Sequence, residues 1–184
     1  MDGMTRSPES TPWILTDPAR QLDQILTLGR ASIGSTVVAA VDSGRDLLGV
    51  RRIATPTPEP VACYQLGARY RSRRTARRAA DADREGTLAD QLSTVTEELL
   101  GPSPRYNQLG PDSRIYMFTV VCREGYVVQT ATEGQFRDAW RRAALLELSD
   151  GDVYVVTPHG WTGFLDGRCG LVPCVPGEAR LRAV

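Results

Sequence analysis

The sequence predicts an α/β (α+β) protein, with a mixed sheet of about five to seven strands and helices packed on it. Short β-branched runs bounded by Gly, Pro, Asp and Ser recur along the chain, as expected of strands. Segments with helical spacing of apolar residues lie between them. A chain of 184 residues with 41% hydrophobic composition can bury one substantial core. We expect a disordered leader over residues 1–12 and a single domain over 13–184, with halves at 13–101 and 102–184 as the alternative.

The first helix is predicted to begin at Pro18, because proline is favoured at the first helical position. Asp17 precedes it as a typical N-cap. Leu22 and Ile25 then fall on one face, and Gly29 is placed to end the helix.

A β-hairpin is predicted next. Residues 36–42 (TVVAAVD) and 46–53 (DLLGVRRI) have the composition of strands, and the segment Ser43-Gly44-Arg45 supplies the turn. Residues 54–60 contain three prolines, which exclude a central strand there.

Two helical segments are expected before the middle of the chain. Residues 69–80 are rich in arginine and alanine, and we expect them to form a mostly solvated helix. A second helix is predicted to start with a capping-box-like pair, Thr87 and Asp90, and to stop at Gly101-Pro102.

Residues 115–122 (IYMFTVVC) form the most apolar run and predict a central strand buried on both faces. We expect residues 123–125 to turn the chain and 126–131 to return as a strand. Thr132 and Gln135 would then open a helix. Its buried stripe is expected to be Phe136, Ala139, Trp140 and Ala143. The fold would thus contain two hairpin–helix units, near 36–100 and 115–148.

The last third predicts a strand at 153–157 (VYVVT) and a closing hairpin. Residues 161–165 and 168–174 flank an Asp166-Gly167 pair, which favours a type I′ turn.

The overall charge excludes a general attraction to nucleic acid or to anionic membranes, because 22 basic and 22 acidic residues give a formal net charge of zero. The first residues lack the apolar region of a secretory signal, and no run is long enough to span a bilayer. We therefore expect a cytoplasmic protein with reduced thiols and no membrane partner.

His159 is the only histidine and the one candidate for catalysis. It follows the predicted strand 153–157, and a histidine in such a loop can act as a general base. No serine or cysteine nucleophile motif accompanies it, and the nearest carboxylates, Asp150 and Asp152, precede the strand. The favoured alternative is that His159 braces its loop while Trp161 packs.

Metal and cofactor sites are not predicted. Cys63, Cys122, Cys169 and Cys174 lack the paired short spacing of a zinc site. Neither a P-loop nor a GxGxxG motif is present, so no nucleotide cofactor is expected.

Local charge reverses along the chain. Residues 51–78 contain eight arginines and one acid, Glu59, whereas residues 81–98 contain six acids and one arginine, Arg84. The favoured interpretation is that these are faces that pair with each other or with a protein partner. The alternative is nucleic-acid binding through phosphate contacts of the arginine segment. The predicted binding residues are Arg69, Arg71, Arg73, Arg74, Arg77, Arg78 and Trp161.

The segment TVVAAVDSGRDLLGVRRI resembles the opening hairpin of JAB/MPN-type domains, including the RadC-like branch. The resemblance extends loosely over residues 36–131. It implies a metal-less relative without peptidase or deubiquitinase activity, because the family's His-x-His pair would fall at Cys122-Arg123-Glu124-Gly125. Residues 151–161 (GDVYVVTPHGW) are similar to a block in uncharacterised actinobacterial proteins.

The expected function is a non-catalytic binding or regulatory module that acts through a protein partner or a second copy of itself. The alternatives are nucleic-acid binding through residues 69–78 and a small-molecule enzyme that uses His159.

Overall fold

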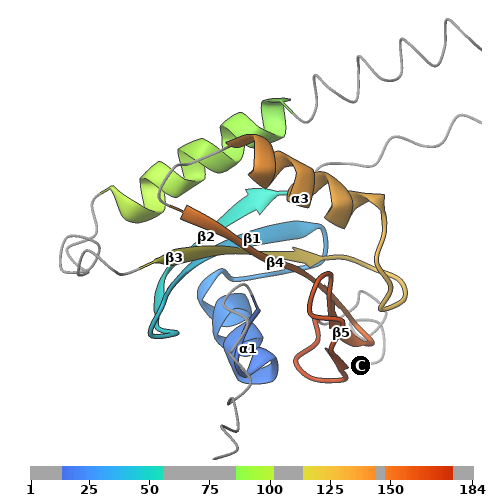
Figure 1. Ribbon diagram of the computed structural model, residues 1–184. Coiled ribbons are helices and arrows are strands. Elements are labelled where there is room, and N and C mark those ends of the chain that lie inside the picture. Colours follow the sequence, from blue (N-terminus) through green and yellow to red (C-terminus); the bar gives the residue numbers. More distant parts are fainter. Residues whose placement is uncertain (1–13, 56–85, 102–113, 144–147, 176–184) are drawn as a thin grey trace, which may run out of the picture.

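The computed structural model describes residues 14–55, 86–101, 114–143 and 148–175 (Figure 1). The predicted leader, residues 1–12, and the arginine-rich segment 69–80 lie outside the described residues. The helices are α1 (Pro18–Leu28), a helix at 86–100 that carries no label, and α3 (Ala131–Ala143). The strands are β1 (Ser35–Asp42), β2 (Leu47–Ala54), β3 (Ile115–Cys122), β4 (Leu148–Thr157), β5 (Gly160–Gly163) and β6 (Cys169–Gly170).

The six strands form one mixed sheet in the order β2-β1-β3-β4-β5-β6, which confirms the predicted fold class. Only β3 and β4 run parallel, and α3 makes the crossover between them. All other neighbouring strands are antiparallel. Because β1 pairs with β3, strands from both halves of the chain share this sheet.

Both faces of the sheet are covered. The 86–100 helix and α3 lie on one face, and α1 lies on the other (Figure 1). Successive residues of β3 alternate between the two cores: Met117 packs toward the 86–100 helix, and Phe118 toward α1. All eight residues of β3 are buried, as predicted for a central strand.

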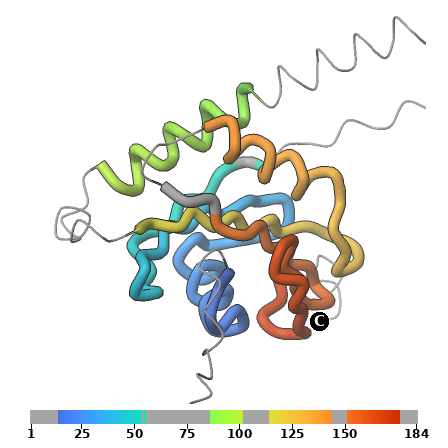
Figure 2. The backbone as a smooth tube through the Cα atoms, viewed as in Figure 1, coloured from blue at the N-terminus to red at the C-terminus, as the bar shows by residue number. Residues whose placement is uncertain are grey.

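The N-terminal and C-terminal parts of the described chain meet on the α1 face (Figure 2). The backbone N–H of Leu15 donates to the hydroxyl of Tyr154 (3.2 Å), and Tyr154 donates to Asp166 (3.0 Å). Arg168 is bound to Asp166 and also donates to the carbonyl of Leu15. This chain of bonds ties the segment that precedes α1 to the loop after β5.

The predicted ends of α1 are confirmed. The carboxylate of Asp17 accepts a hydrogen bond from the N–H of Arg20 (3.2 Å), and Pro18 occupies the first turn. Gly29 ends the helix and packs directly on β1, because a Cβ there would lie 2.7 Å from a methyl group of Val37. Glycine is therefore needed for the helix to approach the sheet this closely.

The predicted strand at 126–131 is wrong. Residues 123–130 form a loop that leads into α3, so the second hairpin–helix unit does not exist. The physical reason is that β3 has no free edge: it pairs with β1 on one side and with β4 on the other. A returning strand would have nothing to pair with.

The predicted capping pair at the start of α3 is also wrong, by two residues. The N-cap is Thr130 rather than Thr132, and its partner is Glu133 rather than Gln135. The Glu133 carboxylate accepts from the backbone N–H (2.5 Å) and the hydroxyl (2.6 Å) of Thr130, as in a capping box. Of the predicted buried stripe, Phe136, Ala139 and Trp140 are buried, and Ala143 is half-buried against the same core.

Thr87 does not cap the second helix, because the chain is already helical at residue 86. The predicted end is confirmed, since the helix stops at residue 100 and the N–H of Gly101 donates to the carbonyl of Glu97 (2.8 Å). The closing hairpin is shorter than predicted: only Trp161 and Thr162 pair across to β6.

One ion pair joins the basic and acidic segments at a described position. Arg51 of β2 lies 2.9 Å from Glu98 of the 86–100 helix, and both side chains are half exposed. This contact is of the kind expected if the two segments pair with each other. The remaining arginines of the basic segment, apart from Arg52, lie outside the described residues.

We expect this pair to contribute little stability. A double-mutant cycle with Arg51→Ala and Glu98→Ala should give a coupling energy of about 1 kcal/mol or less, because water screens exposed pairs. The coupling should shrink further at high salt. Urea unfolding of the four proteins measures it, and a coupling above about 2 kcal/mol would show that the pair is effectively buried.

Candidate binding surfaces

Of the residues predicted to bind a partner, the structure describes only Trp161, because the six arginines from Arg69 to Arg78 lie outside the described residues. Trp161 is 4% exposed, and its ring packs against Tyr154. Its indole N–H donates to the carbonyl of Val172 (2.8 Å). Trp161 is therefore part of the core on the α1 face.

His159 is exposed in the turn between β4 and β5. Its backbone N–H donates to the hydroxyl of Thr157 (3.1 Å), and its ring stacks on Tyr126 at 6.4 Å between centroids. Within the described part of the chain, the imidazole itself has no hydrogen-bond partner. A general base normally has a second polar group to orient it. The contacts of His159 instead indicate that its ring forms part of an exposed surface.

Exposed apolar residues occur in the segments next to His159. Tyr126 is 80% exposed, Leu171 81% and Val172 70%, and Val128 is more than half exposed. We call these four residues and His159 the Tyr126 surface. Its parts adjoin: Tyr126 stacks on His159, and the backbone of Leu171 lies against Gly160. The surface thus joins the loop after β3, the turn after β4 and the segment after β6.

Arg123 holds the first of these loops in place. Its guanidinium donates to the carbonyls of Glu124 (3.2 Å), Tyr126 (3.4 Å) and Val128. It also forms an ion pair with the buried carboxylate of Glu133 (3.1 Å). The loop is therefore fixed to the start of α3 by charge-assisted bonds, and this orders Tyr126.

The Tyr126 surface lies at the carboxyl ends of the two parallel strands, β3 and β4. Loops at this end of a sheet carry binding sites in many α/β proteins. Sequence reasoning missed it because Tyr126 and Val128 fitted an alternating strand pattern. The available signal was the pair of consecutive aliphatic residues after Gly170, Leu171 and Val172.

The three cysteines in the described residues form no disulfide. Cys122 is fully buried, and burial raises the pKa of its thiol to about 12, so it stays protonated. Cys169 and Cys174 are free thiols. Among the described residues, no three His, Cys, Asp or Glu side chains lie close enough together to hold a metal ion.

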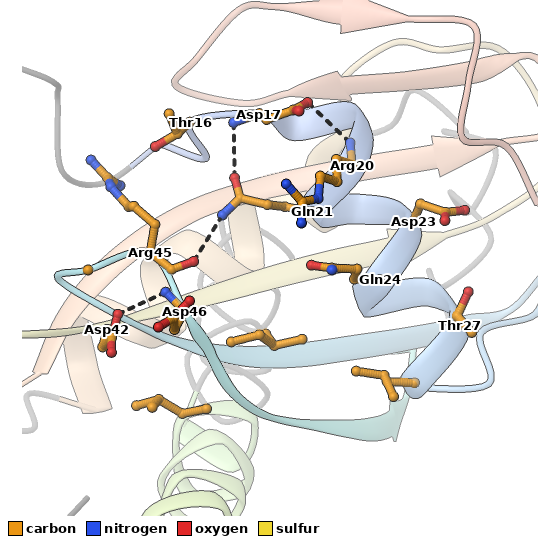
Figure 3. Close-up of a pocket in the computed structure, with 14 residues that line it drawn as sticks. Thr16, Asp17, Arg20, Gln21, Asp23, Gln24, Thr27, Asp42, Arg45 and Asp46 are labelled. Carbon is orange, nitrogen blue, oxygen red and sulfur yellow. Dashed lines mark hydrogen bonds between the residues drawn. The ribbon is translucent and has the colours of Figure 1, made fainter. Parts of the chain in front are cut away.

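A second feature is an open groove of about 1180 Å³ between α1 and the turn that joins β1 to β2 (Figure 3). We call it the α1 groove. At one end Gln21 bridges its two walls: its amide accepts from the N–H of Asp17 (3.1 Å) and donates to the carbonyl of Arg45 (3.5 Å). Because Asp42 pairs with the first residue of β3, this groove lies at the opposite end of the sheet from the Tyr126 surface.

Carboxylates flank the α1 groove. Asp17 and Asp23 belong to the α1 side, and Asp42 and Asp46 belong to the turn (Figure 3). One oxygen of Asp42 accepts from the backbone N–H of Asp46 (2.8 Å), which closes the turn. The carboxylate of Asp17 caps α1, whereas those of Asp23 and Asp46 make no hydrogen bond to the described residues.

Among the described residues, no helix is long and apolar enough to cross a bilayer. Comparison with known protein families, curated proteins and solved structures finds no match to this chain. The relation to JAB/MPN-type domains therefore stays a prediction.

Proposed function

We propose that the protein is a non-catalytic binding module that recognises a protein partner through the Tyr126 surface. The observation that carries this proposal is the group of four large apolar side chains, each more than half exposed, on adjoining loops around His159. Contiguous exposed apolar groups of this kind commonly mark protein interfaces.

The composition of the surface supports a protein rather than a nucleic-acid partner. Aromatic residues are enriched at the centres of protein interfaces, where they bury a large area at a low cost in side-chain entropy. The arginine of this region, Arg123, is bound to Glu133 and to three loop carbonyls. Its guanidinium therefore stabilises the loop and is not directed toward a nucleic-acid phosphate.

The proposal predicts that Tyr126 and Leu171 dominate partner binding. Tyr126→Ser with Leu171→Ser should weaken binding at least about tenfold, because interface hot spots cost about 2 kcal/mol or more when truncated. Sedimentation of the purified protein shows whether the partner is a second copy. Photo-crosslinking from p-benzoylphenylalanine placed at Tyr126 in cells identifies a different protein, whose affinity is then measured with the purified pair.

Leu165→Ser is the matched control. Leu165 is an exposed leucine at the other end of β5, outside the Tyr126 surface, and its replacement should leave binding unchanged. The proposal fails if position 126 crosslinks to no protein. It also fails if the Tyr126 and Leu171 variant binds the crosslinked partner as tightly as the control does.

A further inference from the structure

We infer that the α1 groove is a docking site for an arginine-bearing peptide segment of a partner protein. This inference does not depend on the Tyr126 surface, which lies at the other end of the sheet. It rests on the size of the groove, on the charges that line it and on the apolar side chains between them.

The size and openness of the groove favour a peptide over a small molecule. Its volume of about 1180 Å³ exceeds the range of about 300–1,000 Å³ that is typical of small-molecule sites. Its two walls are the helix α1 and the turn between β1 and β2 (Figure 3). A chain segment can lie between such walls and contact both.

The lining carries two more carboxylates than guanidinium groups, since four aspartates face Arg20 and Arg45. The guanidinium of Arg45 donates to the carbonyl of Ile14 (2.9 Å), so it is committed to the chain preceding α1. Asp23 and Asp46 stand on opposite walls, are exposed, and make no side-chain hydrogen bond to the described residues. These two carboxylates give the groove its attraction for cations.

Apolar groups complete the match to arginine. Leu28 is 63% exposed on α1, and Leu47 lines the groove from β2, where it is only half buried on the α1 face. An arginine side chain has an apolar stem and a planar, charged end that binds carboxylates through two parallel hydrogen bonds. It can therefore cover the leucines with its stem while its guanidinium meets Asp23 or Asp46.

The test uses the full chain and a short fluorescein-labelled peptide of alternating arginine and leucine. Fluorescence anisotropy should show saturable binding that weakens as salt is raised. A twin peptide with citrulline in place of arginine keeps the shape but loses the charge, and it should bind at least about tenfold more weakly. Asp23→Asn with Asp46→Asn should weaken binding of the arginine peptide by at least a similar factor.

The matched control is Asp90→Asn with Asp138→Asn. It removes the same charge from exposed positions of the 86–100 helix and α3, on the other face of the sheet, and should bind like the unmodified protein. Equal weakening by both double variants would show attraction to net charge alone and would overturn the proposal. Absence of saturable binding, or equal affinity for the citrulline peptide, would overturn it as well.

Discussion

Gly160→Ala is expected to lower the free energy of unfolding by about 3 kcal/mol or more, because two costs act at one residue. Gly160 has a φ of 126°, a region that residues with a side chain rarely adopt. An added Cβ would also lie 2.1 Å from the carbonyl oxygen of Gly170, far inside van der Waals contact. The neighbouring atoms are backbone, so no flexible side chain can move aside.

The strand pairing that follows Gly160 should fail first. Relief of the clash requires β6 to move away from β5, which breaks the register of Trp161 with Gly170. It also pulls Val172 away from the indole N–H of Trp161. We therefore expect the variant to lose partner binding as well as stability, because Leu171 and Val172 belong to the Tyr126 surface.

Gly167→Ala is the control for backbone strain alone. Gly167 also has a positive φ, 69°, but no atom lies within 4 Å of an added Cβ. Its replacement should cost only about 1 kcal/mol. Urea unfolding of both variants gives the comparison, and equal unfolding midpoints for the two would contradict the clash at Gly170.

The individual elements of this fold were easier to predict than their neighbours in the sheet. Local signals placed α1, because Asp17, Pro18 and Gly29 act within a few residues of themselves. The run 115–122 was readily predicted as a strand because it is so apolar, and every residue of it is buried. Its partner β4, however, comes after a whole helix, and nothing near β3 in sequence indicates that this edge is already occupied.

Both binding surfaces depend on that sheet order, and this explains why sequence reasoning did not find them. Residues 126–131 were predicted as a strand, and Val127 and Val128 do favour β structure. The α1 groove exists only because α1 packs beside the turn at 43–46, a contact between segments that the charge pattern does not reveal. The charge pattern predicted binding through residues 51–98, whereas the two surfaces described above lie mainly in other segments.

Asp152→Asn is the second substitution with a large expected effect. Asp152 is fully buried at a β-bulge of β4, where two residues oppose one residue of β3. Its carboxylate accepts three backbone N–H bonds, from Val153 (2.8 Å), Leu165 (2.7 Å) and Asp166 (2.9 Å). It therefore fixes the loop after β5, and through Asp166 the contacts to Tyr154 and Arg168.

An asparagine of the same size cannot replace it. The amide has one acceptor oxygen, so its NH₂ group would face an N–H donor where a carboxylate oxygen stood. We expect a loss of about 2–4 kcal/mol in the free energy of unfolding at neutral pH, because at least one buried donor is left without a partner. The exposed control Asp138→Asn should stay within about 0.5 kcal/mol of the unmodified protein. A loss of that small size for Asp152→Asn would contradict the role of this carboxylate.

The pH dependence of this difference gives an independent test. Burial raises the pKa of Asp152 above its ordinary value of 3.8, and the three N–H bonds offset this effect only in part. Between 3.8 and the raised pKa, the folded protein binds more protons than the unfolded chain. Its free energy of unfolding therefore falls as pH rises through that interval.

The contribution of this titration is thus fully present below pH 3.8 and is lost above the raised pKa. Asp152→Asn has no such titration, whereas every other carboxyl group is common to both proteins. The stability difference between the unmodified protein and the variant should therefore be larger in acid and shrink toward neutral pH. Urea unfolding of the pair across this range measures it, and a difference that grows with pH would mean that the N–H bonds outweigh burial and hold the pKa of Asp152 low.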